Sequence, residues 1–223
     1  MIHAILGELQ HGKAIHFPLD NTCPYLDLFV KSQKDFNKKM FKIHARENAT
    51  WSLGGYLENR QIALANYPQM VTQERYFHLG IDINAPAGTP LYAPTDCTVI
   101  KSEYESGEGN YGGMILLEIN NSRAQKADIY EHDLPTPIYL VFGHLALDSL
   151  PKIGTKLNGG AYLATIGDFN ENGNFFHHTH LQALTKRGLD QGWMHKGYCT
   201  RADLATIDNF CPDPTRFIVP CLI

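Results

Sequence analysis

The sequence lacks a long apolar segment at any point along its 223 residues. A helix that crosses a bilayer needs about 18 or more consecutive, mostly apolar residues, and no such run is present. The opening residues contain neither a basic segment nor a continuous apolar segment of the kind found in secretory signals. We therefore expect no membrane span and no signal peptide, and we predict a cytoplasmic protein, with export by another route as the alternative.

Positive charge is also too sparse for a general nucleic-acid binder. The chain carries 19 Lys and Arg against 23 Asp and Glu, which gives a formal net charge of -4. No stripe of basic residues is present to neutralise a phosphate backbone. Nucleic acid is therefore not expected as a partner.

Cysteine is scarce and shows no paired motif. The five cysteines form an odd set without a C-x-x-C pair: Cys23, Cys97, Cys199, Cys211 and Cys221. Such a set favours reduced thiols in a cytosol over a disulfide scaffold. A bridge among the last three is the alternative.

Three common catalytic motifs are missing: the H-E-x-x-H helix of many zinc peptidases, the G-x-S-x-G turn of serine hydrolases and the phosphate-binding P-loop. Residues 107–112 do match G-x-G-x-x-G by letter. A dinucleotide site needs this motif between a strand and a helix, whereas here it lies between two expected strands. We interpret it as a flexible turn.

The sequence does contain enough apolar residues for a sizeable core, at 43% hydrophobic composition. Its periodicity changes near residue 75. Residues 25–44 have the apolar spacing of an amphipathic helix. Later, short β-rich runs are separated by turn residues, at 91–92, 98–104, 114–119, 138–144, 161–166 and 180–185. This part of the chain is predicted to form an antiparallel sheet, sandwich or barrel.

These changes divide the chain into three predicted regions. Residues 1–74 form an N-terminal extension that combines a helix with irregular segments. Residues 75–186 form the β domain, and residues 187–223 wrap over its sheet without a domain of their own.

Histidine is frequent, with 11 residues, and His78 lies four positions before Asp82. On a straight strand these two side chains would be ~13 Å apart, too far to share a metal ion at bond lengths of ~2 Å. Gly80, midway between them, permits a bend that would bring them together. On spacing alone, an ordinary surface His and Asp is the favoured alternative.

A second histidine cluster favours a metal site more strongly. His177, His178 and His180 fall within four residues. On an extended strand His178 and His180 project from one face ~7 Å apart, so one can bind a metal while the other contacts bound water or substrate, and His177 faces the other way. Adjacent imidazoles are costly to bury without partners. His144, at the end of the apolar run 138–142, is a third candidate.

Residues 78–93, HLGIDINAPAGTPLYA, closely resemble the first signature of the lysostaphin/LytM-type zinc metallopeptidases, H-x-G-x-D followed by a P-x-G-T-P-like turn. Later features follow in the family order. They are a Gly-Asn-Tyr-Gly turn at 109–112, a strand that ends in His144, a turn through Gly154 and the H-x-H at 178–180. The likeness spans about residues 75–186.

The resemblance implies the family fold, an antiparallel β-sandwich of the duplicated-hybrid-motif type, here with an N-terminal α-containing extension. It implies that His78, Asp82 and His180 are zinc ligands, with His144 and His178 as catalytic residues that do not bind the metal. Three protein ligands leave a position for a water that Zn²⁺ activates. His178 is expected to act as the base and His144 as the oxyanion or proton-transfer partner.

The predicted function is therefore a zinc-dependent metalloendopeptidase that acts on peptide bonds, in peptidoglycan-type or glycine-rich peptides. The segment before H-x-H departs from the family pattern, because it contains His177 and lacks a proline. An intracellular zinc-binding recognition module and a non-peptidoglycan amide hydrolase on the same fold remain the alternatives. Since an active zinc in a cytosol would threaten other peptides, residues 1–74 are predicted to restrict access, with a structural layer over one sheet as the alternative.

Overall fold

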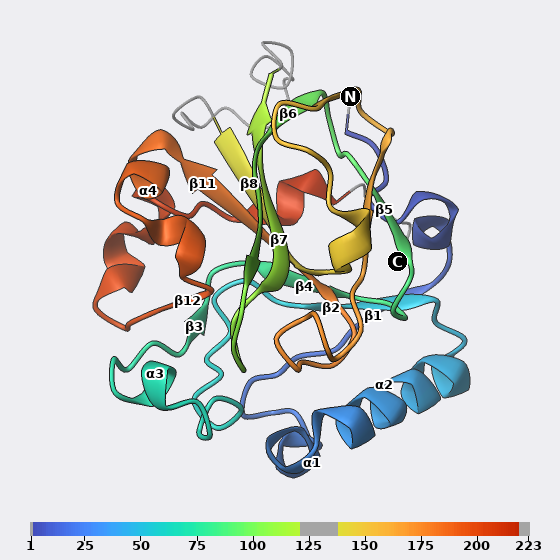
Figure 1. The fold of residues 1–223 in the computed structure, drawn as a ribbon. Helices are drawn as coiled ribbons and strands as arrows, with labels where there is room; N and C mark the ends of the chain where they lie inside the picture. Colours follow the sequence, from blue (N-terminus) through green and yellow to red (C-terminus); the bar gives the residue numbers. More distant parts are fainter. Residues whose placement is uncertain (1, 121–137, 219–223) are drawn as a thin grey trace.

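The computed structural model describes residues 2–120 and 138–218, which are mainly β with few helices (Figure 1). An eight-stranded sheet dominates the fold. Its strands, in spatial order, are β1 (Ala14–His16), β2 (Trp51–Gly54), β4 (Ile81–Asn84), β11 (Thr179–Thr185), β8 (Ile138–Leu145), β7 (Gly112–Ile119), β6 (Cys97–Glu105) and β9 (Lys156–Leu157). Neighbouring strands are antiparallel, except for the parallel pair β1 and β2. The predicted mainly β fold is confirmed.

Two short sheets accompany the large one. In the first, β5 (Pro90–Tyr92) pairs with β10 (Tyr162–Thr165). In the second, β3 (Phe77–His78) pairs with β12 (Tyr198–Cys199). Through this second pair the C-terminal segment is hydrogen-bonded to the strand that carries His78, so Tyr198 lies beside the candidate site although it is distant in sequence.

Both faces of the large sheet are buried, and β8 shows why. Successive side chains of a strand point to opposite faces. Leu140 and Phe142 enter a core that includes Leu91 of β5, whereas Val141 enters a second core with Trp193 of the C-terminal segment. A strand covered on both sides reads as a continuous apolar run, as this one does in the sequence.

The helices are short apart from α2. They are η1 (Gly7–His11), α1 (Leu26–Lys31), α2 (Gln33–Glu47), α3 (Pro68–Val71), η2 (Leu147–Ser149), α4 (Lys186–Asp190), η3 (Trp193–His195), η4 (Asp203–Asn209) and η5 (Pro214–Phe217), where η denotes a 3-10 helix.

The single helix expected over residues 25–44 is divided at Ser32. Ser32 has an extended backbone, and its Oγ accepts a hydrogen bond from the backbone N–H of Asp35 at 3.2 Å. It therefore caps the N-terminus of α2, which satisfies a donor that the helix leaves free. Behind this cap, Phe36 and Met40 form a third core with Phe176, the residue that precedes the histidine cluster.

Residues 1–74 take part in the same sheet as the later strands. β2 pairs with β4, placing Gly54 opposite Asp82. Ile5, Leu6 and Trp51 also belong to the core that β5 and β8 share. The three-region division stays a prediction, but the N-terminal residues directly support the strand that carries Asp82.

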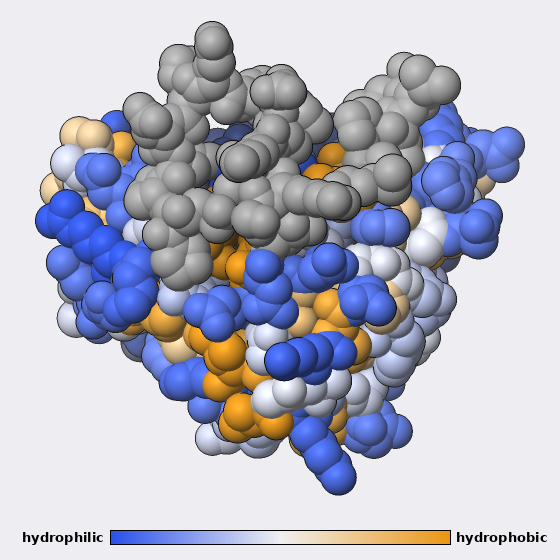
Figure 2. Space-filling model, turned by 90° about the horizontal axis from the view of Figure 1, so that it is seen from above, coloured by the Kyte–Doolittle hydropathy of each residue, from blue (hydrophilic) through white to orange (hydrophobic). Residues whose placement is uncertain are grey.

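The described cysteines and the surface add two observations. Cys23, Cys97, Cys199 and Cys211 are buried, free thiols, so Cys199 and Cys211 are not bridged to each other, and Cys221 lies outside the described residues. Figure 2 shows one face of the molecule, on which hydrophilic side chains are interspersed with apolar ones. Within residues 2–120 and 138–218, no helix has the length and apolar character needed to cross a membrane.

Candidate metal centre and its pocket

His78 and Asp82 lie on two short strands that meet at a bend. His78 ends β3 and Asp82 lies in β4, with Gly80 between the strands. A Cβ added at Gly80 would be 2.6 Å from Cε1 of His180 and 2.5 Å from the backbone oxygen of Leu181. Glycine is therefore required because the imidazole of His180 approaches the backbone closely. The predicted bend is present.

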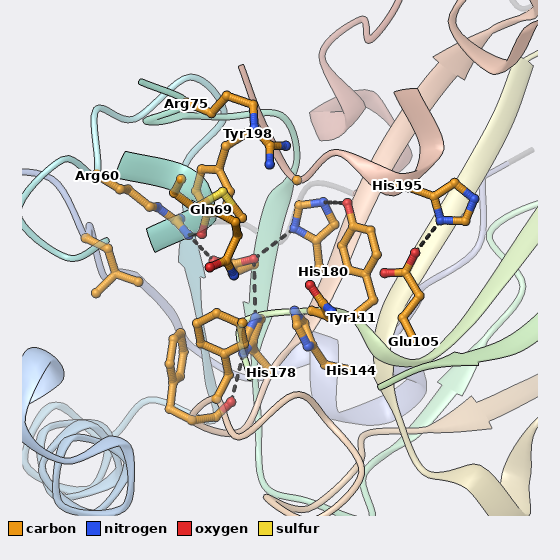
Figure 3. A pocket seen from close by; sticks show the side chains of 18 of the residues that line it. Arg60, Gln69, Arg75, Glu105, Tyr111, His144, His178, His180, His195 and Tyr198 are labelled. Atoms are coloured by element: carbon orange, nitrogen blue, oxygen red, sulfur yellow. Dashed lines mark hydrogen bonds and ion pairs between the residues drawn. The ribbon is translucent and has the colours of Figure 1, made fainter. Parts of the chain in front are cut away.

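Strand pairing brings His180 to the same place. His180 of β11 lies opposite Asp82 of β4 in the sheet register. Nε2 of His78 is 3.0 Å from Nδ1 of His180, and each of these nitrogens is 3.3 Å from Oδ1 of Asp82. Figure 3 shows His180 with its ring turned toward the centre of this cluster. Three side chains from three strands thus direct one atom each toward a common point.

Hydrogen bonds to the opposite ring nitrogens assign the proton positions of the two histidines. Nδ1 of His78 lies 2.9 Å from the backbone oxygen of Gly55, which can only accept, so the proton is on Nδ1. The amide nitrogen of Gln182 donates to the backbone oxygen of Trp193 at 3.2 Å, which leaves Oε1 of Gln182 to accept from Nε2 of His180 at 3.1 Å. Nε2 of His78 and Nδ1 of His180 are therefore unprotonated.

This arrangement fits a zinc ion. Two imidazole nitrogens and one carboxylate oxygen form the three-ligand set of many catalytic zinc sites. Two lone pairs only 3.0 Å apart repel each other unless a cation lies between them. Hydrogen-bonded outer partners such as Gly55 and Gln182 are also what metal-binding histidines usually have. The assignment of His78, Asp82 and His180 as ligands stays a prediction, which this geometry favours.

The structure also brings His144 and His178 together beside this cluster. Their ring centroids are 4.3 Å apart. Nδ1 of His144 donates to the backbone oxygen of Asn172 at 2.7 Å, and Nδ1 of His178 donates to that of Phe176 at 2.8 Å. Nε2 of His178 is 3.5 Å from Oδ1 of Asp82. Each of the two histidines therefore keeps an unprotonated Nε2, and that of His178 adjoins the candidate ligands.

The backbone of His144 departs from the regular strand. Its φ of 64° lies in the left-handed region, which is uncommon for residues other than glycine. Phe142 and Leu145 both enter the main core, so the strict alternation of β8 is broken between them. Hydrogen bonds from His144 N to Tyr111 O and from Gly167 N to His144 O, both 2.8 Å, hold this conformation. The sequence gives no sign of this irregularity.

Burial keeps His78, His144 and His178 uncharged. Burial lowers the pKa of His78 and of His144, and it lowers the pKa of His178 to about 4. For Asp82, burial alone would raise the pKa, but the nearby Arg60 guanidinium holds it well below its usual range. At neutral pH His78 is therefore a neutral imidazole and Asp82 an ionised carboxylate, the protonation states that metal binding requires of these two residues.

A loss of stability in acid follows from the lowered pKa of His178. In the unfolded chain the pKa of His178 has its ordinary value of 6.5, whereas in the folded chain it is about 4. Between these two pH values the unfolded state therefore binds more protons than the folded state. The contribution of His178 to the free energy of unfolding is therefore fully present above about pH 6.5 and is lost as the pH falls toward 4. We expect the metal-free protein to lose roughly 1–3 kcal/mol of unfolding free energy between about pH 7 and pH 4.5. Urea unfolding at several pH values measures this loss, and the His178→Asn variant should show a weaker dependence of unfolding free energy on pH. An equally steep dependence in the variant would contradict the attribution of the loss to His178.

Arg60 is a site residue that the sequence reasoning missed. It is buried, and its Nη1 lies 2.5 Å from Oδ2 of Asp82. Its Nε and Nη2 bond Oε2 of Glu58 at 3.1 and 2.9 Å. A Cβ at Gly54 would come within 2.9 Å of Nη2, so glycine leaves the room that the guanidinium needs. Asp82 therefore offers one oxygen to Arg60 and the other to the histidine cluster.

We expect Arg60→Met to destabilise the metal-free protein by about 3–5 kcal/mol, because two buried carboxylates lose their counter-ion. Bound zinc would compensate the charge of Asp82, so the loss should be smaller in the zinc-loaded protein. Arg46→Met is the control, since Arg46 pairs with Glu47 on the exposed surface and should cost only about 0–1 kcal/mol. Urea unfolding with and without zinc tests this, and similar losses for both variants would refute it.

The cluster lies at the wall of a small cavity. The cavity has a volume of about 70 Å³, and its candidate residues are at most 5% exposed. The N-terminal region contributes Phe29 and Met70 to its lining, and the C-terminal segment contributes His195 and Tyr198 (Figure 3). Pockets for drug-sized ligands are typically ~300–1,000 Å³, so this space admits only small groups. The lid role of residues 1–74 stays a prediction.

Two other missed residues orient His180. Tyr111 donates its hydroxyl hydrogen to Oε1 of Gln182 at 3.1 Å, and its oxygen lies 3.5 Å from Nε2 of His180. Gln182 follows the H-x-H pattern by one further strand period, so it could have been found from the sequence. Tyr111 belongs to the Gly-Asn-Tyr-Gly turn, which indicated a turn but no contact with His180.

The chain was also compared with known proteins. No protein-family model and no curated protein matches it. Among solved structures, the catalytic domain of the antimicrobial peptidase lysostaphin from Staphylococcus simulans matches with 18% identity and a TM-score of 0.38, over 49% of this chain and 68% of that chain.

Two further solved structures are similar. A zinc-containing peptidase from Vibrio cholerae matches with 23% identity and a TM-score of 0.35, over 48% of this chain but only 27% of that chain. LytU matches with 23% identity and a TM-score of 0.39, over 64% of this chain and 79% of that chain. The chain is thus similar to solved structures that include peptidases of the lysostaphin type, the resemblance that its sequence motifs predicted.

Proposed function

We propose that this chain is a zinc-dependent hydrolase of peptide bonds. The observation that carries the proposal is the convergence of His78 Nε2, His180 Nδ1 and Asp82 Oδ1 beside two further imidazoles. A structural zinc site normally has four protein ligands, whereas a catalytic site has three and keeps one position for water or substrate. Neighbouring histidines that are not ligands favour the catalytic type.

When bound, zinc supplies Lewis-acid chemistry that activates water for attack on a carbonyl carbon. His178 is unprotonated at neutral pH and anchored through Nδ1, so its Nε2 is available to accept a proton from that water. His144 holds a second free Nε2 next to it. Once either ring is protonated at Nε2, it can donate a hydrogen bond to a developing oxyanion or pass the proton to the leaving amine.

The finer assignment follows the sequence motifs. We propose an endopeptidase that acts on peptidoglycan-type or glycine-rich peptides, supported by the H-x-G-x-D and H-x-H likeness. We also propose that the large sheet and the β5–β10 sheet packed on it form a β-sandwich of the duplicated-hybrid-motif type. The free, buried thiols support a place in the cytoplasm.

The proposal is tested by measuring metal content and hydrolysis on the same preparation. Zinc-loaded protein is assayed on peptidoglycan, oligoglycines and small amides, with chelator-treated protein as the control. Hydrolysis that disappears on chelation and returns with zinc supports the proposal. If the protein binds one zinc per chain but hydrolyses none of these substrates, the hydrolase proposal is wrong and the alternative, a zinc-binding recognition module, is supported.

A further inference from the structure

Arg75 is a cation in the pocket wall without a partner among the described residues. It lines the cavity that holds the histidine cluster. Its Nε is buried and makes no hydrogen bond, and within residues 2–120 and 138–218 no side chain forms an ion pair with its guanidinium. Arg75 is only partly buried, and a ligand that supplies a negative partner to its guanidinium gains binding energy at this point.

The other charges of the pocket are already matched. Arg60 bonds both Glu58 and Asp82, and Glu105 bonds Nδ1 of His195 across the cavity from Arg75 (Figure 3). Arg75 therefore stands out as the unmatched charge among the described lining residues.

Arg75 also faces the candidate catalytic centre. In Figure 3 its guanidinium points from the segment before β3 toward Tyr198 and the side of the cavity that holds His180. Arg75 lines the same cavity as Tyr111, the residue whose hydroxyl oxygen is 3.5 Å from Nε2 of His180. An anion bound to Arg75 would thus lie in the same small cavity as the reacting groups.

Building on the proposed hydrolase function, we infer that Arg75 binds a free carboxylate of a peptide substrate. A guanidinium presents a planar fork of N–H donors that matches the two oxygens of a carboxylate. The cavity of about 70 Å³ has room for a small group such as a carboxylate.

The kinetic test uses the full-length, zinc-loaded chain and pairs of tri- and tetrapeptides that differ only in a free or amidated C-terminus. We expect kcat/KM for the free acids to exceed that for the amides by roughly 10-fold or more, the size of one charged hydrogen bond. Arg75→Gln should remove this preference by slowing the acids alone. Amides cleaved as fast as acids, or equal losses on both, would overturn the inference.

Arg216→Gln is the matched control. Arg216 also has a buried Nε without a described partner, but it lies over the ring of Phe217 and does not line the cavity. This variant should keep the preference for free acids.

A binding measurement separates this inference from the hydrolase proposal. N-acetylglycine and N-acetylglycinamide are titrated into the zinc-loaded wild type, Arg75→Gln and Arg216→Gln by calorimetry. The acid should bind more tightly than the amide, and Arg75→Gln alone should weaken it by about 10-fold. If this binding pattern is found but no peptide is cleaved, the carboxylate site is supported and the hydrolase proposal fails. If the acid and the amide bind with equal affinity to the wild type and to Arg75→Gln, the carboxylate site is contradicted.

Discussion

Replacing His180 with alanine is expected to remove zinc from the protein. His180 supplies one of the two unprotonated nitrogens that converge with Asp82, and His78 and Asp82 alone leave a two-ligand site. Elemental analysis after zinc loading and dialysis should fall from about one zinc per chain to below ~0.2. Activity should disappear with the metal.

Two histidines act as controls for this loss. His144→Ala removes an imidazole whose hydrogen bond goes to Asn172 rather than into the ligand cluster, so it should keep most of the zinc. His177→Ala should keep all of it, because His177 bonds Asp168 at 2.8 Å and faces away from the cluster, as predicted. If His144→Ala and His180→Ala lose zinc equally, the division into ligands and non-ligands is wrong.

Replacing His178 with alanine should leave the metal in place but lower turnover by roughly 100-fold or more, the usual contribution of a positioned acid or base. The reason is geometric, since Nε2 of His178 adjoins Asp82 while its Nδ1 is fixed by the carbonyl of Phe176. Steady-state kinetics on any substrate that the wild type hydrolyses provides the measurement.

The comparison with His177→Ala makes this test specific. His177 and His178 are neighbours in the chain, so a general disturbance of the start of β11 should affect both variants. A selective fall in kcat for His178→Ala, with zinc content unchanged in both, identifies the base. Unchanged turnover in a zinc-loaded His178→Ala protein removes His178 from the mechanism.

The local features of the site were predictable from sequence because short-range geometry determines them. The bend between His78 and Asp82 follows from four-residue spacing and a midway glycine. His177 bonds Asp168 and faces away from the cluster, although β11 begins only at Thr179, so His177 and His178 precede the strand that was expected to hold them. The strands from residue 90 onward could be read for the same reason, since turn residues separate β-rich runs.

The outer contacts of the site were not predictable, because they join residues far apart in sequence without a shared pattern. Arg60 reaches Asp82 across 22 positions, and Gly55 reaches His78 across 23. The residues around Arg60 lack a helical or strand period, so their position depends on β2 pairing with β4. The division of the predicted helix at Ser32 was missed because a capping serine competes with an otherwise continuous apolar spacing.

The contact of Asp82 with Arg60 ties metal affinity to the N-terminal region. In the proposed zinc site, Asp82 would offer Oδ1 to the metal while Arg60 holds Oδ2, so the free energy of metal binding would depend on where Arg60 lies. Linkage makes the dependence reciprocal: an event that shifts the segment around Glu58 and Arg60 changes the zinc dissociation constant, and zinc in turn biases the position of that segment. Residues 1–74 would thereby influence the metal occupancy of the proposed zinc site.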